Sequence, residues 1–491
     1  MEALGTQVKK SVGWMLVGRV IKFVIHGLSS IAIVRLLEPR IFGIYSIAGL
    51  FIGFTKQFQG FGMGQAIIRH PELKPEHLST FFVANLLGST SLCAALWLAA
   101  PLLETLFREP AAVPVLRFLA LGFLLNPFSS VSSAVLQRRM EFRAQTVANV
   151  VFALSQVLTA LVLAWHGFGV WSLAIGQLTG QTARTLTLVL SARTLPRPRY
   201  SRSAARELAG FSVGMWIKNA ALYAQDRVDY FVVGRWLGAT ALGFYERAYR
   251  IPEALVKEMG STANNVLYSA YSQIQGERER VHAAFRRVVL ALSLPAFPVL
   301  IGALLVAPAL VHVVFGARWD PTVAPLQILC LGGLFRLASQ TSSTLMNALG
   351  QIRLEVWSRL VSFVLMAAGC YFGTRWGLVG VAAAIVAAEL FMAVVMGAIL
   401  VRVGGIPLGS LFRPQIPALQ ATLVMAAGVL LFQTATAAAL GLRSPAMLAS
   451  SVLLGAGLYL GTLYLTRNPA VLEVIGDLLR DARPILQRLK R

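Results

Sequence analysis

The chain has 491 residues, of which 56% are hydrophobic and only 13% are charged, and its formal net charge is +23. Since soluble proteins are about 25% charged, this composition excludes an ordinary soluble domain and indicates a polytopic membrane protein. The positive charge does not favour nucleic-acid binding, because the basic runs alternate with apolar stretches of about 20 residues, the length that crosses a bilayer.

Apolar segments separated by Pro, Gly or charged residues predict about fourteen membrane-spanning helices. The first is long and lacks a convincing cleavage site, so no cleavable signal peptide is predicted. The eighth, 241–271, is the least apolar. We retain this span because most Lys and Arg residues of the loops then lie on the cytoplasmic side of the membrane, together with both termini. Without it, every later loop would move to the opposite side of the membrane. The predicted spans are 11–34, 41–66, 79–106, 112–137, 144–165, 168–191, 207–234, 241–271, 285–315, 321–349, 354–374, 377–401, 415–440 and 445–466.

Two pairs of segments indicate an internal duplication. Residues 35–48 and 235–248 share Arg, Leu, Gly, Tyr and Ala in the same order at an offset of 200 residues. Residues 113–124 and 323–334 share Val, several Leu and Gly at an offset of 210 residues. Either match alone could be coincidence among apolar residues. Both together, in the same order and at nearly the same offset, favour duplication.

The repeat unit contains six predicted helices. Because six is even, the two copies share one orientation and are related by an axis along the membrane normal. The fold class is therefore an all-α polytopic membrane protein with two six-helix lobes related by a pseudo-twofold axis, plus two C-terminal helices. The amphipathic basic tail is expected on the anionic inner leaflet, with a solvated helix as the alternative. The predicted organisation is an N-lobe (1–191), a basic cytoplasmic linker (192–206), a C-lobe (207–401), two further helices (415–466) and the tail (471–491).

Cationic side chains lie within several of these apolar spans. A charge at the centre of a membrane helix costs about 2.5–3.5 kcal/mol, so each must face water, a partner charge or a substrate. The simplest interpretation is a positively charged internal cavity, and therefore an anionic cargo. These residues are Arg19, Lys22, Lys56, Arg117, Arg184, Lys218, Arg227, Lys257 and Arg336.

The span 241–271 carries its polar side chains at steps of three, four or seven residues, so they form one stripe that includes Glu253 and Lys257. Such a stripe lines a cavity, pairs within the helix bundle, or marks a helix that lies at the membrane interface. Glu253 and Lys257 are four residues apart and could partly neutralise each other. The sequence leaves these alternatives open.

Other acidic residues within the spans have two interpretations each. Asp226 and Asp229 form structural ion pairs near the outer end of 207–234, or they couple transport to an ion. Glu389 is a lone acid in an apolar span. It forms a salt bridge with Arg336 or Arg184, or it binds a proton or cation that drives transport.

The sequence predicts no cofactor, no metal site and no enzyme active site. Cys93, Cys330 and Cys370 lie far apart in apolar segments and lack the spacing of metal ligands. The GFGMG sequence at 60–64 has no preceding strand, so close helix packing explains it better than a nucleotide-binding loop. The outward loops are short and contain no nucleophile and base in a catalytic arrangement.

The segments 229–255, 35–50 and 326–334 resemble Wzx-type polysaccharide flippases of the multidrug/oligosaccharidyl-lipid/polysaccharide exporter superfamily. This resemblance extends over essentially the whole chain. It implies two six-helix lobes around a V-shaped cavity and a cargo of undecaprenyl-diphosphate-linked oligosaccharide. The cargo is an O-antigen, capsule or exopolysaccharide unit, which would move from the cytoplasmic to the periplasmic leaflet of a bacterial inner membrane.

The resemblance also implies a substrate site, since related lipid II flippases use cationic residues on their first, second and eighth helices. Arg19, Lys56 and Lys257 occupy these helices here and are expected to hold the diphosphate. Lys stands where the relatives have Arg at two of these positions, which weakens bidentate binding. The remaining expected substrate-binding residues, which contact the diphosphate or acidic sugars, are Lys22, Lys218 and Arg336.

The expected partners are the lipid-linked oligosaccharide, membrane lipids, a polysaccharide polymerase and export machinery, without nucleic acid. A drug/cation antiporter of the same fold is the main alternative function. It is disfavoured because an antiporter of that kind needs an acidic cavity, whereas cations outnumber acids within the predicted spans. A membrane polysaccharide polymerase or ligase is a further alternative, disfavoured by the short outward loops.

Overall fold

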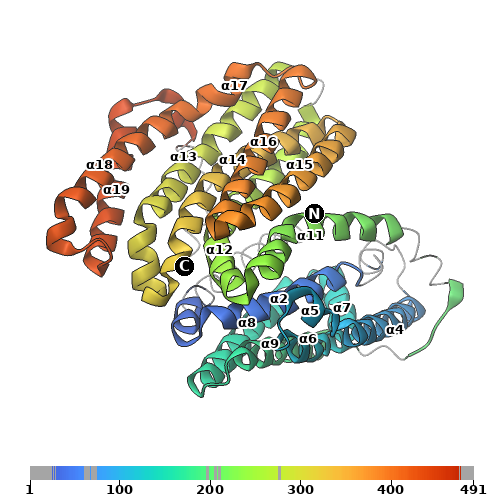
Figure 1. The fold of residues 1–491 in the computed structure, drawn as a ribbon. Coiled ribbons are helices and arrows are strands. Elements are labelled where there is room, and N and C mark those ends of the chain that lie inside the picture. The colour runs from blue at the N-terminus through green and yellow to red at the C-terminus, as the bar shows by residue number, and fades with distance from the viewer. Residues whose placement is uncertain are drawn as a thin grey trace, which may run out of the picture. The chain divides into compact units, whose positions relative to one another are not determined.

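The computed structural model describes residues 25, 27, 29–59, 67, 74–194, 198–203, 207, 212–274, 278–474 and 476, with the side chains of 212–218, 260–274, 278 and 352 left out. These residues form helices joined by turns, with no strand among them, as expected for an all-α chain. The contacts between residues divide the chain into two compact units, Met1–Gly243 and Phe244–Arg491. Figure 1 colours the chain from its N-terminus in blue to its C-terminus in red.

In the first unit, the helices pack against one another in close pairs. Helices α8 and α9 lie side by side (Figure 1), because Gly176 and Gly180 bring α9 against the backbone of Phe152 and Gln156 on α8. Helix α7 packs on α4 and α9, and α11 packs on α2. The helices are α2 (Pro39–Lys56), α4 (Pro75–Ala99), α5 (Leu102–Phe107), α6 (Ala112–Ala120), α7 (Gly122–Arg138), α8 (Phe142–Trp165), α9 (Val170–Ala192), α11 (Ser212–Val232), the π-helical turn η1 (Val233–Leu237) and the first turns of α12 (Gly238–Ile274).

In the second unit, α16 packs against both α14 and α15, and α18 pairs with α19 beside α13 (Figure 1). The Tyr459 hydroxyl on α19 donates a hydrogen bond of 2.6 Å to the Leu294 carbonyl on α13, which ties the C-terminal pair to the rest of this unit. The elements are the remainder of α12, then α13 (Arg278–Leu310), η2 (Val311–Phe315), η3 (Ala317–Thr322), α14 (Val323–Ala348), α15 (Ile352–Gly373), η4 (Thr374–Trp376), α16 (Gly377–Arg402), α17 (Leu408–Phe412), η5 (Arg413–Gln415), α18 (Ile416–Leu440) and α19 (Pro445–Thr466).

Within the described chain, eight helical stretches are long and apolar enough to cross a bilayer. The protein is therefore a multi-pass membrane protein. Helices α2, α9, α11 and α12 fall outside this set, since polar and charged residues lower their hydropathy. Two of them, α2 and α9, carry Lys56, Gln177, Gln181 and Arg184, which are described below. The apolar stretches are Pro75–Ala99, Ala112–Arg138, Phe142–Trp165, Glu279–Phe315, Ala317–Ala348, Arg353–Arg402, Leu408–Leu440 and Pro445–Thr466.

Most predicted spans beyond residue 41 coincide with observed helices to within a few residues, and the weakly apolar span 241–271 lies within α12. The span 112–137 differs, because it consists of two helices, α6 and α7. The amides of Leu121 and Leu124 bond to carbonyls three residues earlier, so a tighter turn separates them. The count of fourteen spans and the pseudo-twofold relation of the lobes stay predictions.

The predicted division into domains also stays a prediction. The boundary between the two compact units lies within α12, after Gly243, whereas the predicted linker is 192–206. Most of the span 11–34, the GFGMG sequence at 60–64 and most of the tail 471–491 lie outside the described residues.

Candidate functional site

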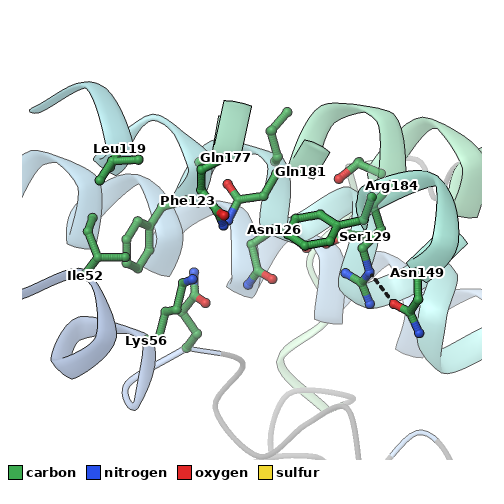
Figure 2. A pocket seen from close by; sticks show the side chains of 15 residues that line it. Ile52, Lys56, Leu119, Phe123, Asn126, Ser129, Asn149, Gln177, Gln181 and Arg184 are labelled. Atoms are coloured by element: carbon green, nitrogen blue, oxygen red, sulfur yellow. Dashed lines mark hydrogen bonds between the residues drawn. The ribbon is translucent and has the colours of Figure 1, made fainter. Parts of the chain in front are cut away.

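A cavity of about 310 Å³ lies within the first unit, and helices α2, α6, α7, α8 and α9 contribute to its wall (Figure 2). We call it the N-terminal cavity. Its wall contains two cationic and several amide side chains, and no acidic residue is among the lining residues. They are Ile52, Lys56, Gln59, Leu119, Gly122, Phe123, Leu125, Asn126, Ser129, Asn149, Phe152, Gln177, Gln181, Arg184 and Thr185.

Helical spacing explains why these polar side chains meet. On α9, Gln177, Gln181 and Arg184 follow one another at steps of four and three residues, which places them on one face of the helix. Asn126 and Ser129 are three residues apart on α7, with the same consequence. The polar face of each helix thus turns toward the cavity, while apolar residues elsewhere on α9, such as Leu186 and Leu190, are exposed.

Lys56 is the last residue of α2. Its side chain lies beside Phe123 and Asn126 (Figure 2). Within the part of the chain that the structure describes, no carboxylate forms an ion pair with it. Its position in the last helical turn is electrostatically favourable, because the C-terminal carbonyls of a helix carry partial negative charge. The ammonium is therefore held at the cavity wall without a neutralising partner among the described residues.

Arg184 supplies the second positive charge. Its Nε donates a hydrogen bond of 3.1 Å to Oδ1 of Asn149 on α8, drawn as a dashed line in Figure 2. A similar bond joins the two helices two turns away, where Gln156 Nε2 donates to Gln177 Oε1 at 2.6 Å. The bond to Asn149 orients the guanidinium without cancelling its charge.

This arrangement suits an anionic ligand that also carries hydroxyl groups. Two cations attract and hydrogen-bond an anion such as a phosphate. The amides of Asn126 and Gln181 can both donate to and accept from hydroxyl groups, as those of a sugar. Among the described residues, no group of three or more His, Cys, Asp or Glu side chains could hold a metal ion.

In the second unit, Arg336 and Glu389 form an ion pair, with 3.8 Å between Nε of Arg336 and Oε1 of Glu389. Arg336 also donates a hydrogen bond to the Tyr249 hydroxyl. Glu253 lines the same small pocket of about 20 Å³. Of the alternatives for Glu389, the salt bridge with Arg336 is present. The predicted role of Arg336 in substrate binding is untested, and this arginine is already partly neutralised.

The other predicted site residues are not brought into either pocket by the described structure. Lys257 is exposed on α12, and Asp229 is buried in α11. Asp226 is also on α11. The side chain of Lys218 lies outside the described set, as do the whole residues Arg19 and Lys22.

Sequence reasoning counted both Lys56 and Arg184 among the cations within the spans, but it named only Lys56 as a substrate-binding residue and left out the amides around them. The signal was present, because Gln177, Gln181 and Arg184 recur at helical spacing within the predicted span 168–191. Asn126 and Asn149 gave no comparable signal, since both are uncharged and each lies in a span that contains several other polar residues. Their role depends on which helices pack together.

Comparison with known proteins agrees with the resemblance inferred from the sequence. The chain is 24% identical over 375 residues to the lipopolysaccharide biosynthesis protein WzxC of Escherichia coli (strain K12), covering 75% of each chain. It is 26% identical over 368 residues to the succinoglycan biosynthesis transport protein ExoT of Rhizobium meliloti (strain 1021), covering 74% of each chain.

Solved structures show the fold. The lipid II flippase MurJ in an inward closed conformation superposes with a TM-score of 0.72 at 14% identity, covering 92% of this chain and 98% of MurJ. An inward-facing multidrug resistance MATE transporter of the MOP superfamily gives a TM-score of 0.63 at 17% identity, covering 78% and 96%. A profile of the polysaccharide biosynthesis protein family matches residues 32–324, more than half of the chain. The chain therefore belongs to the polysaccharide biosynthesis protein family.

Proposed function

We propose that this protein is a flippase that moves undecaprenyl-diphosphate-linked oligosaccharide from the cytoplasmic to the periplasmic leaflet by alternating access through a cationic cavity. The observation that carries the proposal is the N-terminal cavity, in which Lys56 and Arg184 lie among amide side chains with no acid in the wall. The cargo would be an O-antigen, capsule or exopolysaccharide repeat unit.

The physical difficulty in moving this cargo is its polar part. A diphosphate with attached sugars cannot enter hydrocarbon unaided, because its charges and hydroxyl groups would lose their hydrogen bonds to water. Lys56 would compensate the phosphate charge, and the amides of Asn126, Gln177 and Gln181 would replace water around the sugar. The prenyl chain can stay in the lipid, since it gains nothing by entering a polar cavity.

Further cations complete the proposed path of the diphosphate. Arg19 and Lys257 were expected to act with Lys56, and the resemblance to flippases of this superfamily supports that assignment. The proposed helpers are Lys22, Lys218 and Arg336. Asp226, Asp229, Glu253 and Glu389 are proposed as structural ion pairs or as groups that couple transport to an ion.

The names of the relatives favour a transporter over an enzyme. ExoT is a transport protein, and MurJ, which shares the fold, is a flippase. The MATE structures share the fold as well, and a drug/cation antiporter is therefore the second candidate. Such an antiporter binds cations and needs acidic groups at its site, whereas the wall of the N-terminal cavity contains only positive and neutral side chains.

We place the protein in the cytoplasmic membrane of a bacterium, with both termini in the cytoplasm. Its proposed partners are the lipid-linked oligosaccharide, the surrounding lipids, and the polymerase and export machinery that would use the flipped units. The distribution of loop Lys and Arg supports this orientation.

The proposal can be tested in proteoliposomes loaded with undecaprenyl-diphosphate-linked oligosaccharide. A glycosidase added outside cleaves only sugars in the outer leaflet, so its yield measures movement across the bilayer. We expect the protein to raise the cleaved fraction above that of empty liposomes. Export of an organic cation without any effect on the lipid-linked sugar would instead support the antiporter.

A further inference from the structure

A second hollow of the first unit lies along α9, and its wall is apolar where that of the N-terminal cavity is polar. It has a volume of about 390 Å³ and is lined by Phe118 of α6 and by six residues of α9 between Ile175 and Leu186. Among these described residues none is charged. We call this hollow the α9 groove.

The local contacts of the α9 groove make its wall suitable for hydrocarbon. Thr182 Oγ1 donates a hydrogen bond of 3.0 Å to the Leu178 carbonyl one turn earlier on the same helix, so this hydroxyl needs no partner in the groove. The Phe118 ring packs edge-to-face on Trp171, with 5.5 Å between the ring centroids, which holds the ring in place at one end. Leu186, at the other end, is exposed. The groove therefore suits an apolar chain better than a polar ligand.

The α9 groove and the N-terminal cavity are separated by one seam of helix contact. On α9, Gln181 lines the cavity and Thr182 lines the groove. On α6, Leu119 lines the cavity and Phe118 lines the groove. Because successive residues of a helix point about 100° apart, neighbouring faces of the same helices form the polar wall and the apolar wall.

The seam is narrowest in side chains at Gly122, the first residue of α7. Gly122 follows Phe118 by four residues and also lines the N-terminal cavity. A methyl group added at Gly122 would overlap Oε1 of Gln181, so the end of the glutamine side chain occupies the space that a larger residue would fill. A glutamine side chain can change rotamer without moving its helix. The connection between cavity and groove therefore depends on one flexible side chain.

We propose that the α9 groove holds the prenyl chain of the cargo while its diphosphate lies in the N-terminal cavity, the two being joined past Gly122. This inference rests on the proposed function, because it takes the cargo to be a prenyl diphosphate. The division of the wall matches the division of that molecule, which has an anionic head and a hydrocarbon chain.

The tether to the head distinguishes this chain from those of ordinary membrane lipids. A hydrocarbon chain gains little on moving from lipid into an apolar groove, because lipid is equally apolar. A free phospholipid chain is therefore not retained there. A chain whose diphosphate is bound across the seam has a high effective concentration at the groove. From Ile175 to Leu186 the groove extends about 16 Å at 1.5 Å per residue, so it holds the part of the chain next to the head.

The test uses two photoreactive forms of undecaprenyl diphosphate on the unmodified protein in nanodiscs of phosphatidylethanolamine and phosphatidylglycerol. One form reacts next to the phosphates and the other within the first isoprene units. We expect the first to label the N-terminal cavity and the second to label α9 from Leu178 to Leu186, with about fivefold less labelling at Leu190. Leu190 is exposed on the same helix and does not line the groove. Excess unlabelled undecaprenyl diphosphate should remove both signals.

The outcomes separate the groove from the proposed function. Chain labelling spread evenly over the apolar helices, with head labelling still in the cavity, would overturn the groove and leave the function standing. Equal labelling of the groove by a photoreactive phosphatidylglycerol would assign it to bulk lipid and would also overturn the inference. Head labelling outside the cavity would instead refute the proposed function.

A variant that fills the α9 groove gives a second measurement. Ala183→Phe places a large ring in the wall, and we expect chain labelling there to fall about fivefold while head labelling in the cavity stays. The matched control is Leu190→Phe, seven residues later on the same face of α9 and outside the groove, which should change neither signal. Unchanged chain labelling in Ala183→Phe would contradict the inference. If this variant folds poorly, the labelling of the unmodified protein remains decisive.

Discussion

Replacing Lys56 by alanine is expected to weaken binding of a prenyl diphosphate substantially without unfolding the protein. The side chain lies at the wall of the N-terminal cavity and makes no ion pair within the described chain. Its loss therefore leaves no carboxylate unpaired among the described residues. Because Arg184 remains on the same wall, binding should be weakened and not abolished.

The size of the effect follows from the bond that is lost. A hydrogen bond between an ammonium and a phosphate contributes about 1.5–3 kcal/mol, which corresponds to a 10- to 150-fold rise in Kd, roughly. Full coulombic attraction at 4 Å would be about 4 kcal/mol at an effective dielectric constant of 20, but the desolvation of both charges offsets part of it. We therefore expect the binding free energy to weaken by about 1.5–3 kcal/mol and not by the full coulombic value of about 4 kcal/mol.

The measurement is the Kd of purified protein for undecaprenyl diphosphate in detergent, by titration calorimetry. Lys56→Arg should bind at least as tightly as the parent, since a guanidinium can contact two phosphate oxygens. Arg375→Ala removes an exposed cation that lies in the second unit and should leave the Kd unchanged. If Lys56→Ala binds as the parent does, or if Arg375→Ala weakens binding equally, the assignment of the site is refuted.

Three further outcomes are expected. Arg184→Lys keeps the positive charge but loses the hydrogen bond from Nε to Asn149. We therefore expect the rate of flipping of lipid-linked sugar to fall several-fold, with little change in the temperature of thermal unfolding. An unaltered flipping rate would contradict the role of the guanidinium. Glu389→Gln removes the carboxylate that pairs with Arg336, and both side chains are about one-fifth exposed. The free energy of unfolding should therefore fall by about 1–2 kcal/mol. An unchanged unfolding curve in detergent would show that this ion pair does not stabilise the protein. Tyr459→Phe removes a buried hydrogen bond between α19 and α13 and should lower the free energy of unfolding by about 1 kcal/mol, while the Kd for prenyl diphosphate stays that of the parent.

The helices were predictable because a membrane span is a local property of the sequence. About 20 apolar residues between polar breaks are sufficient to indicate one, and 354–374 and 377–401 correspond closely to α15 and α16. The turn between α6 and α7 was missed because both helices are apolar across it. Hydropathy does not register a change of hydrogen bonding over two residues.

The candidate site was only partly predictable, because it depends on which helices meet. A lysine in an apolar span indicates a functional position, and Lys56 was found for that reason. The sequence left Glu389 with two arginine partners to choose from. The structure pairs it with Arg336 on the neighbouring helix α14, while Arg184 bonds to Asn149 in the other unit. Which arginine pairs with Glu389 could be decided only from the tertiary packing of the helices.

The internal repeat illustrates the same division. The sequence shows that residues 35–48 and 235–248 correspond, but it does not show that they touch. Only the structure brings Gly43 to Ala239 and Gly243 to Pro39. The contact between these repeat-equivalent segments is therefore a result of the structure and could not be predicted from the matching residues alone.

The most direct test of the account is to locate the diphosphate in the protein. A photoreactive prenyl diphosphate, with the reactive group next to its phosphates, is crosslinked in membranes and the labelled peptides are identified by mass spectrometry. The account predicts labelling in α2, α7 and α9 around Lys56, Asn126 and Gln181, with much less labelling in Lys56→Ala. Labelling confined to other helices, or equal labelling of that variant, would contradict the claim that the N-terminal cavity holds an anionic lipid-linked cargo.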